Sequence, residues 1–338
     1  MATDVLTDDR YTMPSVTFAV PPNHRLSNLG AFQDLLHVAN RQWQKTFGNQ
    51  DVQFEWHTAS IDGKPVEAAT GLKVAMDSSL KEAPESNIIV IPALTYTTRA
   101  QWDKDLTELT ELFQWLYERR DTDLIVSHCT GVFSLAESGL LDNRSATTAW
   151  WLKDQFRDRY PSIQLDIEQL IVESDNILTG AAGNSDQLLA LNIINRYMGP
   201  QITALVSKLL LVDLNRMEQT PFLTLQQQLE HTDSLVADAQ TWLQNNLKES
   251  AAVSNLPEVL KVSARTLIRR FNNALGETPN RYLQNLRIDT AKRLLETTDQ
   301  SVEVIMSQVG YTDLSSFSRL FQRKTGLTPR AYRHRFHV

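Results

Sequence analysis

The sequence predicts a doubly wound α/β domain followed by an all-α domain. Three observations support this. Apolar runs alternate with helical patterns through the first two-thirds of the chain, whereas every later segment is helical in pattern. The net charge also changes sign along the chain. Residues 261–338 hold 14 Lys and Arg against 6 Asp and Glu, a net charge of +8, which leaves −15 on residues 1–260 of a total of −7. An acidic body with a basic module is typical of a protein that binds a polyanion.

Four apolar runs in the first part are expected to be strands, and several are apolar on both faces, as buried parallel strands are. They are SVTFAV (15–20), VQFEWHTA (52–59), NIIVIPAL (87–94) and DLIVSH (123–128). The helices expected around them cover residues 29–44, 104–120, 131–141, 185–199 and 202–214. Strands that alternate with helices predict a largely parallel sheet with helices on both faces.

The composition changes after this α/β pattern ends. Residues 216–231 are glutamine-rich and have no clear apolar period, and all seven Trp lie at or before Trp242. The expected organisation is therefore a tail, an α/β domain, a linker and a helical domain. Their boundaries are 1–13, 14–215, 216–231 and 232–338.

The helical domain repeats itself at an offset of fifty residues. The matched pairs are Arg269 and Arg319, Phe271 and Phe321, Gly276 and Gly326, Thr278 and Thr328, Pro279 and Pro329, and Tyr282 and Tyr332. In both copies the Gly is placed to end one helix in a left-handed cap. The Thr-Pro pair is placed to begin the next helix as N-cap and first helical residue. This ordered set of identities indicates a duplicated structural unit.

Each copy contains a short helix, a tight turn and a second helix, which is the helix-turn-helix pattern. The two units cover about 254–276 and 302–326, and Ser263 and Asp313 are placed as N-caps of the second helices. Within those helices, one stripe of apolar residues is expected to face the core. It consists of Leu267, Phe271 and Leu275 in the first unit and Phe317 and Phe321 in the second.

The opposite stripe carries side chains that can contact DNA. It consists of Arg265, Thr266, Ile268 and Arg269 in the first unit, and Leu314, Ser315, Ser318 and Arg319 in the second. Arginine can bind guanine edges in a major groove, Ser and Thr can bind bases or phosphates, and Ile268 suits a thymine methyl. The alternative is that these arginines are only solvated surface. The duplication and the local charge of +8 favour DNA binding.

The second unit, GYTDLSSFSRLFQRKTGLTPRAYR, resembles the DNA-binding domain of the AraC/XylS family of transcription regulators along its whole length. The resemblance covers residues 232–338 and implies seven helices, with residues 280–296 as the long helix that connects the two units. Two such units can enter successive major grooves about 34 Å apart. One departure is Lys261, where the first turn of that family usually carries a glycine.

The only cysteine, Cys129, lies where a buried strand turns directly into a helix, in DLIVSHCTGVFSL. This is the arrangement of a nucleophile elbow, in which small neighbours are needed because the strand and helix backbones approach closely. Ser127 and Gly131, two residues on either side, meet that need. A thiol at a helix N-terminus is also expected to have a lowered pKa.

The stretch SHCTGVFSLAESGLLDNRSATTAWW resembles the flavodoxin-like domain of class I glutamine amidotransferases and PfpI-type proteases, in the form that is fused to AraC-type regulators. The groups that would activate the thiol are missing. Thr130 follows the cysteine, the next histidine after His128 is His231, and Ala149 stands where related sequences often carry histidine. The chain also lacks an acidic residue between positions 16 and 33, where relatives place a glutamate. The prediction is a protein that is not an enzyme, with His128 as a packed residue.

In doubly wound folds, ligands bind beyond the carboxyl ends of the strands. The residues expected to line such a site are Asn23, His24, Pro92, Ala93, Thr95, Tyr96, Cys129, Thr130 and Trp150. Tyr96, Trp150 and Trp151 could form an aromatic cage for a cationic head group, or could simply be core residues. The resemblance to the fused regulators implies a small nitrogen metabolite, such as an amino acid or a betaine-like amine.

Together these features predict a cytoplasmic transcription regulator that needs no cofactor or metal. The α/β domain would sense a small-molecule effector, and the helical domain would bind double-stranded promoter DNA. By resemblance, the expected partners also include RNA polymerase and a second copy of the chain, with no membrane. A single cysteine excludes an internal disulfide. Two alternatives stay open: a cysteine-dependent amidase or hydrolase with a DNA-binding appendage, and a redox-sensing regulator that acts through Cys129.

Overall fold

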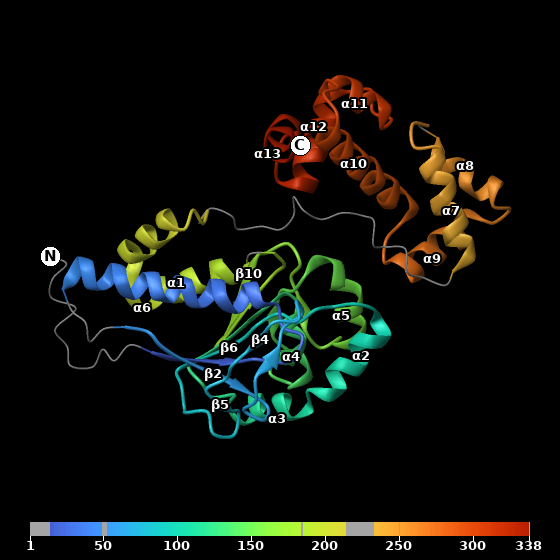
Figure 1. The fold of residues 1–338 in the computed structure, drawn as a ribbon. Coiled ribbons are helices and arrows are strands. Elements are labelled where there is room, and N and C mark those ends of the chain that lie inside the picture. The colour runs from blue at the N-terminus through green and yellow to red at the C-terminus, as the bar shows by residue number, and fades with distance from the viewer. Residues whose placement is uncertain (1–13, 49–52, 184, 214–232, 250, 338) are drawn as a thin grey trace. The chain divides into compact units, whose positions relative to one another are not determined.

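The chain divides into two compact units, Met1–Gln219 and Thr220–Val338 (Figure 1). The computed structural model describes residues 14–48, 53–183, 185–213, 233–249 and 251–337. The tail and the linker expected from the sequence, and His231, lie outside these described residues. Each unit is built around its own apolar cores.

The first unit contains a seven-stranded sheet in the order β10-β11-β7-β6-β1-β2-β5. Every neighbouring pair is parallel except β10 and β11, which are antiparallel. The strands are β1 (Ser15–Ala19), β2 (Glu55–Ser60), β5 (Ser78–Ser79), β6 (Ile88–Ile91), β7 (Leu124–His128), β10 (Ile171–Ser174) and β11 (Ile177–Gly180). Two short pairs lie outside this sheet: β3 (Val66–Glu67) with β4 (Lys73–Val74), and β8 (Ser145–Ala146) with β9 (Gln164–Leu165). The doubly wound α/β prediction is confirmed.

Successive side chains of β6 point into different cores, because side chains alternate across a sheet. Ile88 and Val90 pack with α1 (Leu26–Phe47) and α6 (Ser185–Leu209) on one face. Ile89 and Ile91 belong to the core of the other face. That face is covered by α2 (Arg99–Glu108), α3 (Thr110–Glu118), α4 (Val132–Glu137) and α5 (Lys153–Arg159). Two-sided burial explains why these strands are continuously apolar.

One helix differs from the sequence prediction and one break is confirmed. The helix expected over 104–120 is two helices, α2 and α3, which meet at Leu109. The two helices expected at 185–199 and 202–214 are the two parts of α6, which are separated by a kink where Gly199 has a non-helical conformation (φ 78°) before Pro200. A glycine with positive φ followed by proline interrupts the helix, and the second part ends at Leu209.

The second unit has seven helices in its described ranges, as the resemblance implied. They are α7 (Ser234–Asn245), α8 (Ala252–Val259), α9 (Ala264–Leu275), α10 (Pro279–Thr297), α11 (Val302–Gln308), α12 (Leu314–Thr325) and α13 (Pro329–Phe336). The first helix-turn-helix unit is α8 with α9, and the second is α11 with α12. Helix α10 connects them, as Figure 1 shows.

The predicted caps are present in both units. The Thr266 amide donates to Ser263 Oγ at 3.1 Å, and the Ser316 amide donates to Asp313 Oδ1 at 2.7 Å. Gly276 and Gly326 end α9 and α12 with φ values of 68° and 73°. Thr278 and Thr328 then cap α10 and α13, each followed by Pro. The repeat is therefore a repeat of helix boundaries.

The turn of each helix-turn-helix unit contains one residue in the left-handed conformation, but the residue type differs. Gly310 has φ 82° in the second turn, and Lys261 has φ 52° at the corresponding place in the first. A side chain in this conformation costs roughly 1–2 kcal/mol relative to glycine. The lysine therefore keeps the turn geometry of the glycine at some cost in stability.

None of the helices in the described ranges is both long and apolar enough to cross a membrane.

The tight elbow after β7 gives a test of the packing. A Cβ on Gly131 would lie 2.5 Å from Ser127 Oγ and 2.8 Å from the Pro92 carbonyl oxygen, so Gly131→Ala should lower the free energy of unfolding by about 1–3 kcal/mol. Urea unfolding followed by tryptophan fluorescence measures this, since six of the seven Trp lie in the first unit. The control is Gly30→Ala in α1, where a Cβ meets nothing within 4 Å. Equal effects of both substitutions would contradict the close approach at Gly131.

Candidate functional site

Helices α9 and α12 have equivalent buried and exposed faces. Leu267, Phe271, Phe317 and Phe321 are each at most 2% exposed and lie in the apolar cores of their units. Leu275 is only partly buried and packs at the edge of its core. Burial of these aromatic side chains fixes the rotation of each helix, and the other face is thereby turned to solvent.

The eight residues predicted to read DNA lie on that outer face. Arg265, Arg269, Leu314, Ser315 and Arg319 are exposed, and so is Ile268, whereas Thr266 and Ser318 are half-buried. Thr266 Oγ1 lies 2.9 Å from Ser263 Oγ and thereby takes part in the N-cap. Ile268 at 44% and Leu314 at 39% are exposed apolar side chains at the start of the two helices.

The arginines of the second unit fall into two groups. Arg270 is held by Asp233 through Nε and Nη2 at 2.7 and 2.5 Å, and Arg287 is bound to backbone carbonyls. In contrast, the guanidinium groups of Arg265, Arg269 and Arg319 form no hydrogen bond or ion pair with any other residue that the structure describes. These three arginines are among those that the sequence placed on the outer face, so they are available for an anionic partner.

Cys129 has the geometry of an elbow but not an activated thiol. Its φ is 52°, it is 4% exposed, and it follows β7 directly at the start of a short 3-10 helix, Cys129–Gly131. Its amide donates to the Ala181 carbonyl at 3.1 Å, and its carbonyl accepts from Thr148 Oγ1 at 2.6 Å. The prediction of a lowered pKa is wrong, because burial raises the pKa of the thiol.

His128 is packed inside the sheet domain, as predicted. It is 2% exposed, and burial, with the nearby charge of Arg25, lowers its pKa to about 3. Neither ring nitrogen has a hydrogen-bond partner among the described residues. Burial is the largest cause of the raised pKa of the Cys129 thiol, and Thr130 and Arg25 act in the opposite direction. The neighbouring imidazole of His128 forms no hydrogen bond with the thiol in the part of the chain described.

The predicted ligand-wall residues lie along the carboxyl edge of the sheet. Thr130 Oγ1 donates to the Leu94 carbonyl at 2.6 Å, and the Thr95 amide donates to the Asn23 carbonyl at 2.9 Å. Pro92, Ala93, Cys129, Thr130 and His24 are buried, Thr95, Tyr96 and Trp150 are half-buried, and Asn23 is exposed. Hydrogen bonds therefore join the loops after β1, β6 and β7, whose outer residues are exposed and whose inner residues are buried.

The three predicted cage aromatics pack against the core around α2, α4 and α5. Tyr96 lies beside Trp102 with ring centroids 5.5 Å apart, and its hydroxyl donates to Gln155 Oε1 at 2.9 Å. Trp150 lies edge-to-face on Trp151, also at 5.5 Å. These contacts fit core packing, and the cage stays a prediction.

The sequence analysis missed a buried polar group at the same edge. Asn28 Nδ2 donates to Asp186 Oδ2 at 3.1 Å, which joins the first turns of α1 and α6. Burial raises the pKa of Asp186, which is 3% exposed, and its Oδ1 has no described partner. The sequence could have revealed this pair, because both residues are polar and lie in the first turn of a helix that follows an apolar strand. The carboxyl ends of parallel strands bring such first turns to one edge of the sheet.

Comparisons with known proteins match both units. Residues 256–335 match the family model described as a helix-turn-helix domain, and residues 45–196 match that of the DJ-1/PfpI family. The HTH-type transcriptional regulator GbdR of Pseudomonas aeruginosa is 25% identical over 94% of this chain and 83% of its own length. The HTH-type transcriptional regulator CdhR of the same species is 29% identical, over 82% and 80%. A crystal structure of a THiJ/PfpI family protein from Pseudomonas syringae shares the fold of the first unit, with a TM-score of 0.50, 16% identity, and coverage of 63% of this chain and 81% of that one.

Two capped helix-turn-helix units with free outward arginines, joined to a doubly wound sheet domain, define a DNA-binding transcription regulator. With an AraC-type helix-turn-helix domain and a DJ-1/PfpI domain, the chain resembles AraC-family regulators along most of its length.

Burial of Cys129 predicts slow chemical modification. Iodoacetamide at pH 8 should alkylate the folded chain at least about tenfold more slowly than the same chain in urea, since the thiol is both shielded and more protonated than a free one. Mass spectrometry of samples taken over time measures the two rates. Equal rates would mean that the thiol is accessible and would reopen the enzyme and redox alternatives.

His128 predicts a pH dependence of stability. The unfolded imidazole gains a proton near pH 6.5, whereas the folded one stays neutral down to about 3. The free energy of unfolding should therefore fall as pH drops from 6.5, by up to about 1.4 kcal/mol per pH unit from this group. Urea unfolding between pH 7 and 5 should show a shallower slope in His128→Gln and an unchanged slope in His37→Gln, whose side chain is exposed. The same slope in all three proteins would contradict the buried neutral imidazole.

Proposed function

We propose that the chain binds promoter DNA sequence-specifically through α9 and α12, and that a small effector held by the α/β unit adjusts this binding. The observation that carries the proposal is the free outer face of both helices. Three arginines lie there that form no hydrogen bond or ion pair with another described residue, beside exposed apolar and hydroxyl side chains. This mixture can distinguish bases, whereas contacts to phosphates alone carry no sequence information.

Each side-chain type has a role in this proposal. Arg269 and Arg319 bind guanine edges, and Arg265 binds a base or a phosphate. Ile268 and Leu314 contact thymine methyl groups. Thr266, Ser315 and Ser318 donate to bases or phosphates from the first turns of the two helices, where the backbone amides also favour negative charge.

Selection of bound fragments from a genomic DNA library by the purified protein tests sequence specificity. Two salt concentrations are used, because binding through phosphates alone weakens steeply as salt rises. Recovery of one motif with two spaced segments at the higher salt is expected. Recovery of unrelated fragments that are lost at higher salt would reduce the helical unit to an electrostatic anchor.

Single arginine substitutions test the base contacts. Arg269→Ala or Arg319→Ala should each cost about 1–3 kcal/mol on the recovered duplex and relax the preference at one base position. Titration of the duplex and of its single-base variants, followed by fluorescence anisotropy, measures both effects. Arg293→Ala is the matched control, an exposed arginine on α10 rather than on α9 or α12. Uniform weakening on every sequence would assign phosphate contacts instead.

The effector is proposed to bind at the carboxyl edge of the sheet, near the predicted wall residues and the Asn28–Asp186 pair. Support comes from the position, since doubly wound folds bind ligands there, and from polar atoms left without described partners. The HTH-type transcriptional regulators GbdR and CdhR match this chain across both units. An effector changes DNA binding only through different affinities for two arrangements of the protein.

A panel of amino acids and quaternary amines identifies effectors by two readouts. A compound that raises the melting temperature and also changes the affinity for the recovered duplex supports the sensor role. A panel without such a compound would argue against an amine effector.

We further propose that the chain is not an enzyme. The buried thiol, its raised pKa and the lack of a hydrogen-bond partner for either ring nitrogen of His128 among the described residues support this. Cys129→Ser should keep DNA binding, and neither protein should hydrolyse amide substrates. Amide turnover that is lost in Cys129→Ser would favour the hydrolase, and DNA binding that responds to peroxide only in the wild type would favour the redox sensor.

Dimerisation and contact with RNA polymerase complete the proposal. Sedimentation of the full chain at two concentrations tests the first, and transcription from the recovered promoter in a purified system tests the second.

A further inference from the structure

We infer that Arg287 holds the two helix-turn-helix units in one relative orientation, and thereby sets the spacing between the DNA segments that α9 and α12 accept. This inference rests on the proposed DNA-reading role of those helices. It concerns a residue on the connecting helix α10, away from both reading surfaces.

Arg287 joins α10 to the end of α7. Its Nε donates to the Leu247 carbonyl and its Nη2 donates to the Glu249 carbonyl, both at 2.9 Å. Helix α7 has just ended at Asn245, so these carbonyls belong to the loop that follows it. A planar guanidinium can bind two carbonyls at once with fixed geometry, which a lysine ammonium cannot.

The turn of the second helix-turn-helix unit packs against the same loop. A Cβ on Gly310, in the turn between α11 and α12, would lie 2.9 Å from the Leu247 carbonyl oxygen, and 3.0 Å from both Lys248 Cα and Arg287 Nη2. The guanidinium of Arg287 also lies 5.4 Å from the ring centroid of Tyr311, the next residue. One arginine thus contacts the loop that leads into the first helix-turn-helix unit through two carbonyls, and the second helix-turn-helix unit through the backbone of its turn and an aromatic ring.

The side chain of Leu247 packs at the same point. It contacts the core around the first helix-turn-helix unit, which contains Phe271, and the core around the second helix-turn-helix unit, which contains Phe317. The two cores are otherwise separate clusters. We call the contact made by Leu247, Arg287, Gly310 and Tyr311 the junction.

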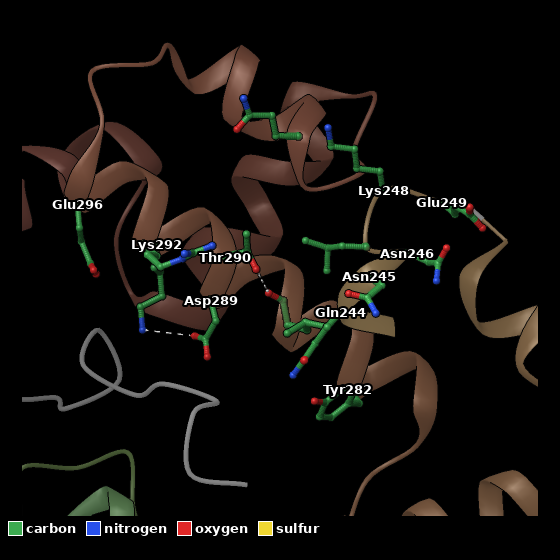
Figure 2. A pocket seen from close by; sticks show the side chains of 14 residues that line it. Gln244, Asn245, Asn246, Lys248, Glu249, Tyr282, Asp289, Thr290, Lys292 and Glu296 are labelled. Atoms are coloured by element: carbon green, nitrogen blue, oxygen red, sulfur yellow. Dashed lines mark hydrogen bonds and ion pairs between the residues drawn. The ribbon is translucent and has the colours of Figure 1, made fainter. Parts of the chain in front are cut away.

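A cavity of about 730 Å³ opens beside the junction. Figure 2 shows Gln244 and Lys248, from α7 and its following loop, on one side of it, and Asp289 and Glu296, from α10, on the other. The cavity therefore lies between the loop after α7 and the connecting helix α10. Arg287 ties this loop to α10 and to the turn at Gly310, which makes it a positioning residue.

The relative orientation matters because two major grooves on one DNA face are about 34 Å apart. Insertion of one base pair moves the second segment by about 3.4 Å and rotates it about the helix axis. A rigid pair of reading helices would accept one spacing, whereas a loosened pair would accept several.

Arg287→Lys tests the junction with the positive charge retained, and Arg293→Lys on the same helix is the matched control. Spin labels introduced as unnatural amino acids at the exposed positions 272 and 322, on α9 and α12, report the distance between the reading helices by pulsed electron resonance. The distance distribution should broaden in Arg287→Lys and stay as in the wild type in Arg293→Lys. Circular dichroism confirms that the helices are retained. An unchanged distribution in Arg287→Lys would overturn the inference, whether or not the chain binds a specific promoter.

The second measurement uses the duplex recovered by genomic selection, and a version with one base pair inserted between its two segments. The wild type and Arg293→Lys should lose at least about thirtyfold in affinity on insertion, which is about 2 kcal/mol. Arg287→Lys should bind the original duplex more weakly and lose less than about fivefold on insertion. An equal insertion penalty in all three proteins would show that Arg287 does not set the spacing.

Discussion

Helix capping at the start of α9 and α12 is the constraint on which the DNA-binding face depends. Ser263 and Asp313 accept a hydrogen bond from the backbone three residues later, which fixes the first helical residue in each case. Each cap contributes about 1 kcal/mol to stability, but its larger effect is to fix the residue at which the helix begins. With the first residue fixed, burial of Phe271 and Phe321 in the cores sets the rotation of each helix, and Arg269 and Arg319, two residues earlier, point to solvent.

The same logic explains why the sheet domain has an elbow without an activated nucleophile. Close approach at Gly131 requires the turn after β7, and the turn places Cys129 at the sheet edge in a left-handed conformation. Burial then keeps the thiol protonated, and the neighbouring imidazole of His128 is itself buried and neutral. The elbow geometry is therefore a property of the fold, and reactivity would need solvent and a base in addition.

The arginines with protein partners and those without them have different roles in the helical unit. Arg270 and Arg287 are held by a carboxylate and by carbonyls, and they tie helices together. Arg265, Arg269 and Arg319 have no such partner among the described residues, and they face outward. Because a guanidinium keeps its charge at any physiological pH, its role depends on which acceptor lies within reach.

The sequence by itself determined the layer architecture, the caps and the outer face of α9 and α12, and its resemblance to the AraC/XylS family implied the seven helices. The architecture, caps and outer face follow from local periodicity and from cap and turn residues, which act within a few positions of one another. Only the tertiary structure decided the raised pKa of Cys129, the Asn28–Asp186 pair and the contact of Arg287 with Leu247 and Gly310. Each of these depends on burial or on atoms far apart in the chain. The short strands β10, at the sheet edge, and β11, beside it, were missed for a related reason, since four-residue strands take their pairing from neighbours rather than from their own pattern.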